Sequence, residues 1–276
     1  MFAAVRELRR NRYDAAIDLQ GLIKSAAVAR MSGAGRVIGF ATRHLRERLA
    51  RPFYTEVQDP GGGALRDRTP PRHVVHLNLG LLGALGIEAP AVEFPIDDTP
   101  SEIARSIQDE TGGRYALLNP GAAWPNKRWP PHRLASLAAA VRDRHRLMSV
   151  VLWGPGEREL AEAVVAGAHE SAVMTPGTTI ADVVALCRGA SAMVSGDTGP
   201  THIAAAVGTP IVGIYGPTRP ERNGPWRPDD ITVSRATVCE CHHLRKCRRD
   251  RMCLLDIEVD EVLSAVERRL QAGRRV

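Results

Sequence analysis

The residues with the clearest chemistry lie in the turn Ser195-Gly-Asp-Thr-Gly-Pro-Thr-His202, where glycines lead into a helix that starts near Pro200. The first backbone amides of a helix have no partner within the helix, and with the helix dipole they attract anions. We therefore predict that the amides of Thr198, Gly199 and Thr201 bind a phosphate. The alternative is that this turn only caps the helix.

Charged side chains elsewhere could complete such a site. Lys127, one of three lysines among 37 basic residues, would place a compact positive charge on a diphosphate. Asp197 is expected to hold loop amides or to accept from sugar hydroxyls, because a carboxylate would repel the diphosphate. Glu157 or Glu159 could bind a ribose diol. His202 is either a phosphate donor or a packed core histidine.

Simpler interpretations exist for two of these side chains. Lys127 and Arg128 stand beside Trp124 and Trp129, so they could form a surface cation–π cluster. Glu157 could be an acidic residue that only favours the start of a helix. The choice depends on whether the elements of the chain bring these loops together.

The C-terminal two thirds of the chain alternate between short apolar runs and helical stretches. This alternation predicts a parallel sheet with helices on both faces, in which ligands bind beyond the carboxyl ends of the strands. The expected strands are 115–118, 148–153, 172–174, 192–195 and 210–215, and the expected helices are 131–144, 157–167, 180–188, 200–207 and 259–272. Four glycine-bearing loops follow these strands, and their shared edge favours a nucleotide site.

The N-terminal part has a weaker pattern. It predicts a strand over 13–20, a helix over 21–31, a strand over 36–40 and a helix over 73–85, before a linker over 90–100. We therefore expect two domains, 1–92 and 93–276.

Composition and charge limit the class of protein. The 276 residues are 44% hydrophobic and 25% charged, and no apolar run is long enough for a membrane span or a signal core, so we expect a soluble cytoplasmic protein. Residues 1–51 hold 11 basic and 4 acidic residues, against 26 and 27 in the remainder. This excess predicts an anionic partner or only a solvated arginine-rich surface. Nucleic acid is disfavoured, because aromatic residues make up 4% and no nucleic-acid motif is present.

Four cysteines lie within fifteen residues, at Cys239, Cys241, Cys247 and Cys253. They could ligate zinc or an iron–sulfur cluster, or they could be reduced or redox-paired thiols. The Cys-x-Cys spacing is tighter than the usual Cys-x-x-Cys metal hairpin, and we predict no metal in the chemistry of the site.

Several long motifs resemble glycosyltransferase family nine, the ADP-heptose:lipopolysaccharide heptosyltransferases. These are Tyr13-Asp-Ala-Ala-Ile-Asp-Leu-Gln-Gly-Leu-Ile-Lys-Ser25, Asn119-Pro-Gly-Ala-Ala-Trp-Pro-Asn-Lys-Arg-Trp-Pro130, the turn 195–202 and the run 213–226. The resemblance implies a GT-B fold with two Rossmann-like domains, the nucleotide sugar on the C-terminal one and the acceptor on the N-terminal one. It also implies an inverting reaction without a metal, in which a carboxylate deprotonates the acceptor hydroxyl.

The resemblance implies roles for individual residues. Gln20 and Lys24 would line the acceptor side, and the ADP-sugar would be held by Lys127, Glu157, Asp197, Thr198, Gly199 and His202. The basic N-terminal segment suits an anionic lipopolysaccharide-core acceptor and peripheral contact with the inner membrane.

The family's opening strand, turn and helix, which carry the acid thought to be the base, do not precede Tyr13. We therefore expect an N-terminally shortened member with impaired turnover, in which Asp14 and Asp18 are poor substitutes for that acid. The alternatives are a GT-B enzyme that uses another nucleotide sugar, an epimerase, or a non-catalytic module that binds nucleotide or membrane.

Overall fold

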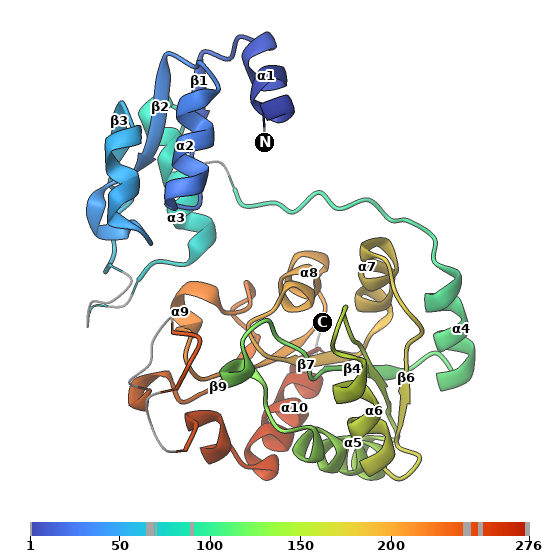
Figure 1. Ribbon diagram of the computed structural model, residues 1–276. Coiled ribbons are helices and arrows are strands. Elements are labelled where there is room, and N and C mark those ends of the chain that lie inside the picture. Colours follow the sequence, from blue (N-terminus) through green and yellow to red (C-terminus); the bar gives the residue numbers. More distant parts are fainter. Residues whose placement is uncertain are drawn as a thin grey trace. The chain divides into compact units, whose positions relative to one another are not determined.

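The chain forms two compact units in the computed structural model, Met1–Glu93 and Phe94–Val276 (Figure 1). The structure describes residues 2–64, 69, 71–88, 91–239, 244–247 and 251–273. Residues 91–100, predicted as a linker, form neither helix nor strand.

The N-terminal unit is built on a parallel sheet of three strands in the order β1-β2-β3. The strands are β1 (Ala15–Ile17), β2 (Arg36–Phe40) and β3 (Glu56–Gln58), and the helices are α1 (Phe2–Arg10), α2 (Ile23–Met31) and α3 (Val74–Gly80). The prediction for 36–40 is confirmed, whereas the predicted strand 13–20 is shorter. It ends early because the Asp18 side chain turns the chain by accepting from the amides of Gln20 and Gly21.

The C-terminal unit contains a six-stranded parallel sheet in the order β6-β5-β4-β7-β8-β9. The sequence predicted a parallel sheet and the approximate positions of β4 to β8 in the chain, but not the order of the strands. The strands are β4 (Tyr115–Asn119), β5 (Met148–Val151), β6 (Ala172–Met174), β7 (Ala192–Ser195), β8 (Ile211–Tyr215) and β9 (Ile231–Ser234). The helices are α4 (Glu102–Thr111), α5 (Pro131–His145), α6 (Arg158–Gly167), α7 (Ile180–Gly189), α8 (Gly199–Val207), α9 (Pro220–Asn223) and α10 (Val259–Gly273).

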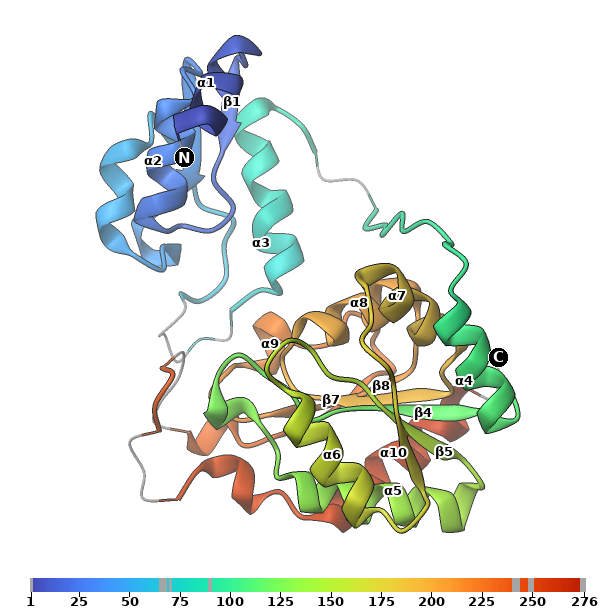
Figure 2. The same ribbon diagram turned by 45° about the vertical axis from the view of Figure 1, so that its right-hand side comes forward.

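Helices cover both faces of this sheet (Figure 2). Helices α5, α6 and α10 pack on one face, and α4, α7 and α8 pack on the other. Successive strand residues face opposite ways, so Leu118 packs in the first core and Leu117 in the second. The sheet is therefore buried on both sides, and ligands can reach it only at an edge.

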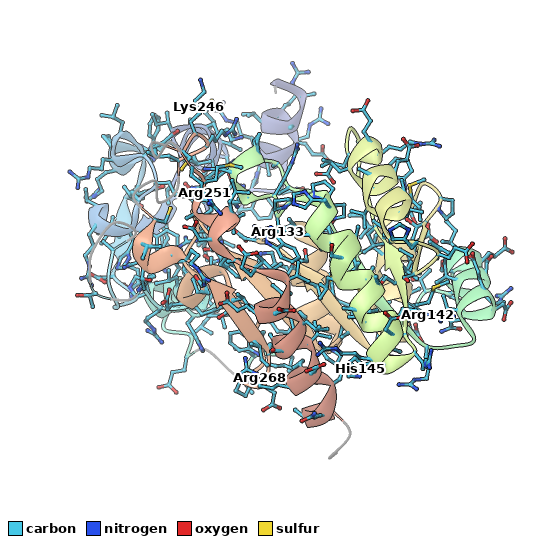
Figure 3. All side chains as sticks on the ribbon, turned by 90° about the horizontal axis from the view of Figure 1, so that it is seen from below. Arg133, Arg142, His145, Lys246, Arg251 and Arg268 are labelled. Atoms are coloured by element: carbon cyan, nitrogen blue, oxygen red, sulfur yellow. The ribbon has the colours of Figure 1, made fainter. Side chains whose placement is uncertain are left out.

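The side chain of Arg133 fixes the turn before α10 to helix α5. Arg133 of α5 donates to the carbonyls of Leu255 and Ile257 and lies 3.1 Å from Glu258 (Figure 3). Trp129 also donates to Ile257 O, at 3.0 Å. The loop after β4 is thus joined to the last helix of the unit. No helix in the described ranges has the length and apolar character needed to cross a membrane.

Candidate functional site

The predicted loops of the C-terminal unit all leave the same edge of the sheet. Strands β4, β5, β7 and β8 are parallel, and Asn119 at the end of β4 pairs in register with Ser195 at the end of β7. The loops that follow Asn119 and Ser195 are therefore neighbours. This arrangement is what the sequence pattern predicts for a nucleotide-binding edge.

Helix α8 presents its N-terminus at this edge. Thr198 is the N-cap residue, and its extended backbone leads into Gly199 and Pro200. The first bond of the helix runs from His202 N to Thr198 O, at 3.4 Å. Within the described parts of the chain, the amides of Gly199 and Thr201 have no acceptor, and a side chain at Gly199 would meet open space. These amides are free to bind an anion.

The side chains of Lys127 and His202 lie next to this helix terminus, on either side of Asp197. Lys127 Nζ is 2.7 Å from Asp197 Oδ2, and His202 Nε2 is 3.3 Å from Asp197 Oδ1. Lys127 also lies over the ring of Trp124, with Nζ 4.5 Å from the centroid. The side chain of His202 is 44% exposed, so it is not a core histidine.

Of the two roles expected for Asp197, the structure does not show the bonds to loop amides, and binding of sugar hydroxyls stays a prediction. One of its oxygens faces Lys127 and the other His202, and no loop amide donates to them among the described residues. Burial opposes its ionisation, but the hydrogen bond from His202 and the charge of Lys127 lower the pKa of Asp197 to about 2. The carboxylate therefore stays charged at neutral pH and orients Lys127 and His202. This role follows from burial, because a desolvated carboxylate needs a charged partner.

Glu157 contacts the loop after β4, which carries Lys127, whereas Glu159 points away to the surface. Glu157 precedes α6, and its Oε2 accepts from Gly154 N at 3.2 Å. The carboxylate rests on the backbone of Gly121: a Cβ atom at that position would be 2.0 Å from Oε2. Glu159 is exposed on the first turn of α6. Gly121 was missed by sequence reasoning, although its place in the Asn-Pro-Gly turn is a signal for close approach.

In the N-terminal unit, Gln20 and Lys24 are exposed on the loop after β1 and on the first turn of α2. The Asp18 side chain fixes this loop through hydrogen bonds. It is 4% exposed, and it accepts from Gln20 N at 2.8 Å, Ser25 Oγ at 3.0 Å and Tyr54 OH at 2.6 Å. Burial and the bond to Asp18 raise the pKa of Tyr54. Because the oxygens of Asp18 are already occupied, its role is structural.

The described part of the cysteine segment contacts the loop after β4, which carries Lys127. Cys239 and Cys253 are buried and pack with Cys247 and Leu244. Leu244 O accepts from Asn126 Nδ2 at 2.8 Å. The described residues contain no group of three or more histidine, cysteine or acidic side chains arranged to hold a metal. Cys241 lies outside the described residues, so the fourth of the candidate ligands is not placed.

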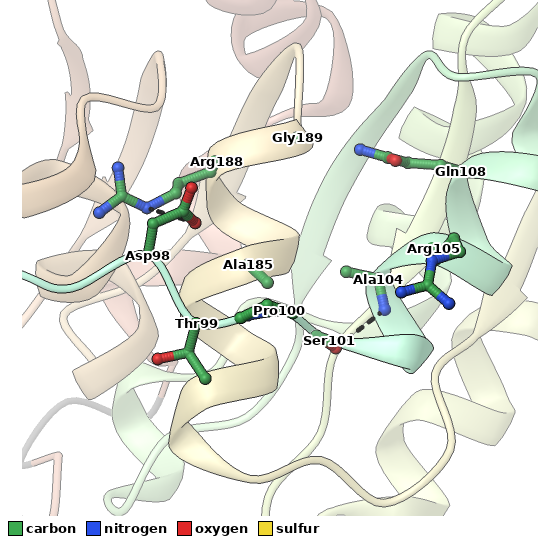
Figure 4. Close-up of a pocket in the computed structure, with 10 residues that line it drawn as sticks. All are labelled: Asp98, Thr99, Pro100, Ser101, Ala104, Arg105, Gln108, Ala185, Arg188 and Gly189. Carbon is green, nitrogen blue, oxygen red and sulfur yellow. Dashed lines mark hydrogen bonds and ion pairs between the residues drawn. The ribbon is translucent and has the colours of Figure 1, made fainter.

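A cavity of about 370 Å³ lies between α4 and α7, away from these loops (Figure 4). Arg188 closes one side, where it donates to Ile96 O at 2.6 Å and lies 3.7 Å from Asp98. The cavity contains none of the predicted site residues. The cavity is lined by the end of the linker, by α4 and by α7, and it does not belong to the candidate site.

Comparisons with known proteins identify the family and the fold of the chain. Residues 1–252 match glycosyltransferase family 9 (heptosyltransferase). Lipopolysaccharide heptosyltransferase 1 of Pseudomonas aeruginosa is 29% identical over 231 residues, which cover 82% of this chain and 61% of that protein. The chain thus matches less than two thirds of the length of this relative.

Two solved structures have the same fold. E. coli heptosyltransferase WaaC with ADP has a TM-score of 0.68 at 24% identity and covers 97% of this chain and 77% of its own. E. coli ADP-heptose lps heptosyltransferase II has a TM-score of 0.71 at 22% identity and covers 99% and 81%. These likenesses identify the fold as that of GT-B heptosyltransferases. Because the family match extends over most of its length, the chain belongs to glycosyltransferase family 9, the heptosyltransferase family.

Proposed function

We propose that this protein transfers heptose from an ADP-sugar to the inner core of lipopolysaccharide. The observation that carries the proposal is the open N-terminus of α8 beside Lys127, which suits the diphosphate of a nucleotide sugar. The name of the P. aeruginosa relative and the ADP in the E. coli WaaC structure support the choice of donor and acceptor.

The proposed reaction inverts the anomeric carbon. The acceptor oxygen forms a bond to C1 of the heptose while the bond from C1 to the diphosphate oxygen breaks, and ADP leaves with the electron pair. Lys127 and the amides of Gly199 and Thr201 stabilise the charge that develops on the diphosphate, so the step needs no metal. The proton of the acceptor hydroxyl goes to a base other than Asp18, whose oxygens are occupied.

A transfer assay tests this proposal. The protein is incubated with ADP-heptose and lipopolysaccharide that lacks inner-core heptose, with and without a chelator. We expect release of ADP and a heptosylated product of inverted configuration at an unchanged rate in the chelator. Binding of ADP without transfer would favour a non-catalytic module. A thermal shift with another nucleotide sugar but not with ADP would favour a different GT-B donor.

The contact between Glu157 and Gly121 leads to a first prediction. Gly121→Ala places a methyl group where the Glu157 carboxylate now lies, so the carboxylate must move away from the nucleotide edge. If Glu157 binds the ribose, we expect ADP affinity to fall about tenfold, as for loss of one charge-assisted hydrogen bond. Isothermal titration with ADP measures this affinity. Gly177→Ala is the matched control, because a side chain there meets open space; equal affinities of both variants would contradict the prediction.

We also infer that the N-terminal unit contacts the anionic cytoplasmic surface of the inner membrane. Exposed apolar side chains stand on two adjoining segments: Leu19 is 50% exposed, Ile23 38% and Leu49 73%. The segments are joined by bonds from Glu47 N to Gly21 O and from Ile23 N to the Glu47 carboxylate. Exposed basic residues flank them, namely Lys24, Arg46 and Arg48. Apolar side chains among cations are typical of proteins that bind anionic membranes.

Vesicle sedimentation tests this surface. We expect binding to phosphatidylglycerol vesicles but not to phosphatidylcholine vesicles, and about a tenfold weaker partition for Leu49→Ser. Ile180→Ser is the control, because Ile180 is also 73% exposed but lies in the C-terminal unit. Equal losses for the two variants, or equal binding to both lipids, would show that this surface does not dock on the membrane.

A further inference from the structure

A buried network of hydroxyl groups lies beneath the start of α8. Asn119 is 6% exposed, and its Nδ2 donates to Thr198 Oγ1 at 2.9 Å and to Ser195 Oγ at 3.2 Å. Thr198 Oγ1 also lies 3.1 Å from Thr201 Oγ1, which donates to Ser195 Oγ and to Gly196 O. The network fixes the turn between β7 and α8 from the side of β4.

Within this network, the Thr198 side chain does not cap its own helix. A threonine at the N-cap normally accepts a hydrogen bond from the second or third amide of the helix. The second residue here is Pro200, which has no N–H, so Thr201 N is the amide available to the Thr198 side chain. The structure has no such bond: the Thr198 hydroxyl instead accepts from Asn119 Nδ2 and lies within hydrogen-bonding distance of the Ser195 and Thr201 hydroxyl groups. The Thr201 amide therefore stays open.

We propose that Asn119 is a positioning residue that keeps Thr198 from capping its own helix, and so preserves the amides of Gly199 and Thr201 for the diphosphate. This inference rests on the proposed function. It gives a reason for the amide side chain that is buried at the end of β4. It assigns Asn119 a role in donor binding without contact with the donor.

The test combines nucleotide affinity with amide exchange. In Asn119→Ala the Thr198 hydroxyl is free to turn toward Thr201 N, so hydrogen exchange of the Thr201 amide slows about tenfold or more and ADP affinity falls about tenfold. In a Thr198→Val background no hydroxyl can cap the helix. There we expect Asn119→Ala to change ADP affinity by less than about twofold. Ser195→Ala is the comparison variant: it removes the 3.2 Å contact of Ser195 Oγ with Thr198 Oγ1 but keeps the bond from Asn119, so we expect it to lower ADP affinity less than Asn119→Ala does.

The outcomes separate this inference from the proposed function. Unchanged Thr201 exchange in Asn119→Ala overturns the inference, as does an equal loss of affinity with and without the Thr198 hydroxyl. Failure of the wild-type protein to bind ADP overturns the proposed function, while the exchange measurement still reports on Asn119. If the alanine variant does not fold, Asn119→Ser gives the same comparison, because its side chain is too short to reach Thr198.

Discussion

Replacing Lys127 with alanine is expected to weaken ADP binding about 100-fold, or about 2.7 kcal/mol. The ammonium group supplies one charge-assisted contact to the diphosphate, worth about 1.5–3 kcal/mol. Its removal also leaves the Asp197 carboxylate, 2.7 Å away in the wild type, without its nearest cation. That carboxylate then repels the diphosphate. Isothermal titration with ADP measures the loss.

Two further variants isolate the cause. Lys127→Ala combined with Asp197→Asn should recover about tenfold of the lost affinity, because the repelling carboxylate is gone. Lys246→Ala is the control, since it removes another of the three lysines at an exposed position. An unchanged affinity in Lys127→Ala, or an equal loss in Lys246→Ala, would contradict the proposed contact.

Replacing Arg269 with methionine is expected to lower the free energy of unfolding of the C-terminal unit by about 3–5 kcal/mol. Arg269 of α10 lies 2.9 Å from Asp230, and their side chains are 4% and 1% exposed. Burial raises the pKa of Asp230, against the lowering effects of Ile211 N and Arg269. Without the guanidinium, a buried carboxylate remains with one backbone bond, from Ile211 N. Urea unfolding followed by tryptophan fluorescence measures the change.

The neighbouring residue provides the control. Arg268 is exposed on the same helix (Figure 3), and Arg268→Met should change the free energy of unfolding by less than about 0.5 kcal/mol. Asp230→Asn combined with Arg269→Met removes the uncompensated charge and should recover most of the stability. A loss for Arg269→Met no larger than that for Arg268→Met would show that the pair does not hold α10 to the sheet.

The sheet of the C-terminal unit could be predicted because its strands are buried on both faces. The runs at 192–195 and 211–215 are almost wholly apolar, and β7 and β8 occupy them. Strand β9 was missed although Ile-Thr-Val-Ser alternates between apolar and polar residues, because the run is only 4 residues long and follows a polar turn. Helix α4 was missed because it has few apolar residues. Its sequence does carry a start and a stop signal, Ser101 at the N-cap and Gly112 at the C-cap, where the structure has the left-handed conformation.

The backbone of the site could be predicted from the sequence, whereas the contacts between its side chains could be predicted less well. The glycines and Pro200 indicate the open helix terminus, because they restrict the local backbone. The pairs Lys127–Asp197 and Asn119–Thr198 were not predictable, since their members lie about 70 to 80 residues apart in the chain. Such contacts depend on strand order, and no local pattern encodes that order.

Amide chemical shifts of Gly199 and Thr201 during nucleotide titration test the central claim most directly. We predict that ADP shifts both amide signals strongly, whereas adenosine, which has no phosphate, leaves them in place. ADP that binds without moving these two signals, or adenosine that moves them as much as ADP, would contradict the claim that the start of α8 binds the diphosphate.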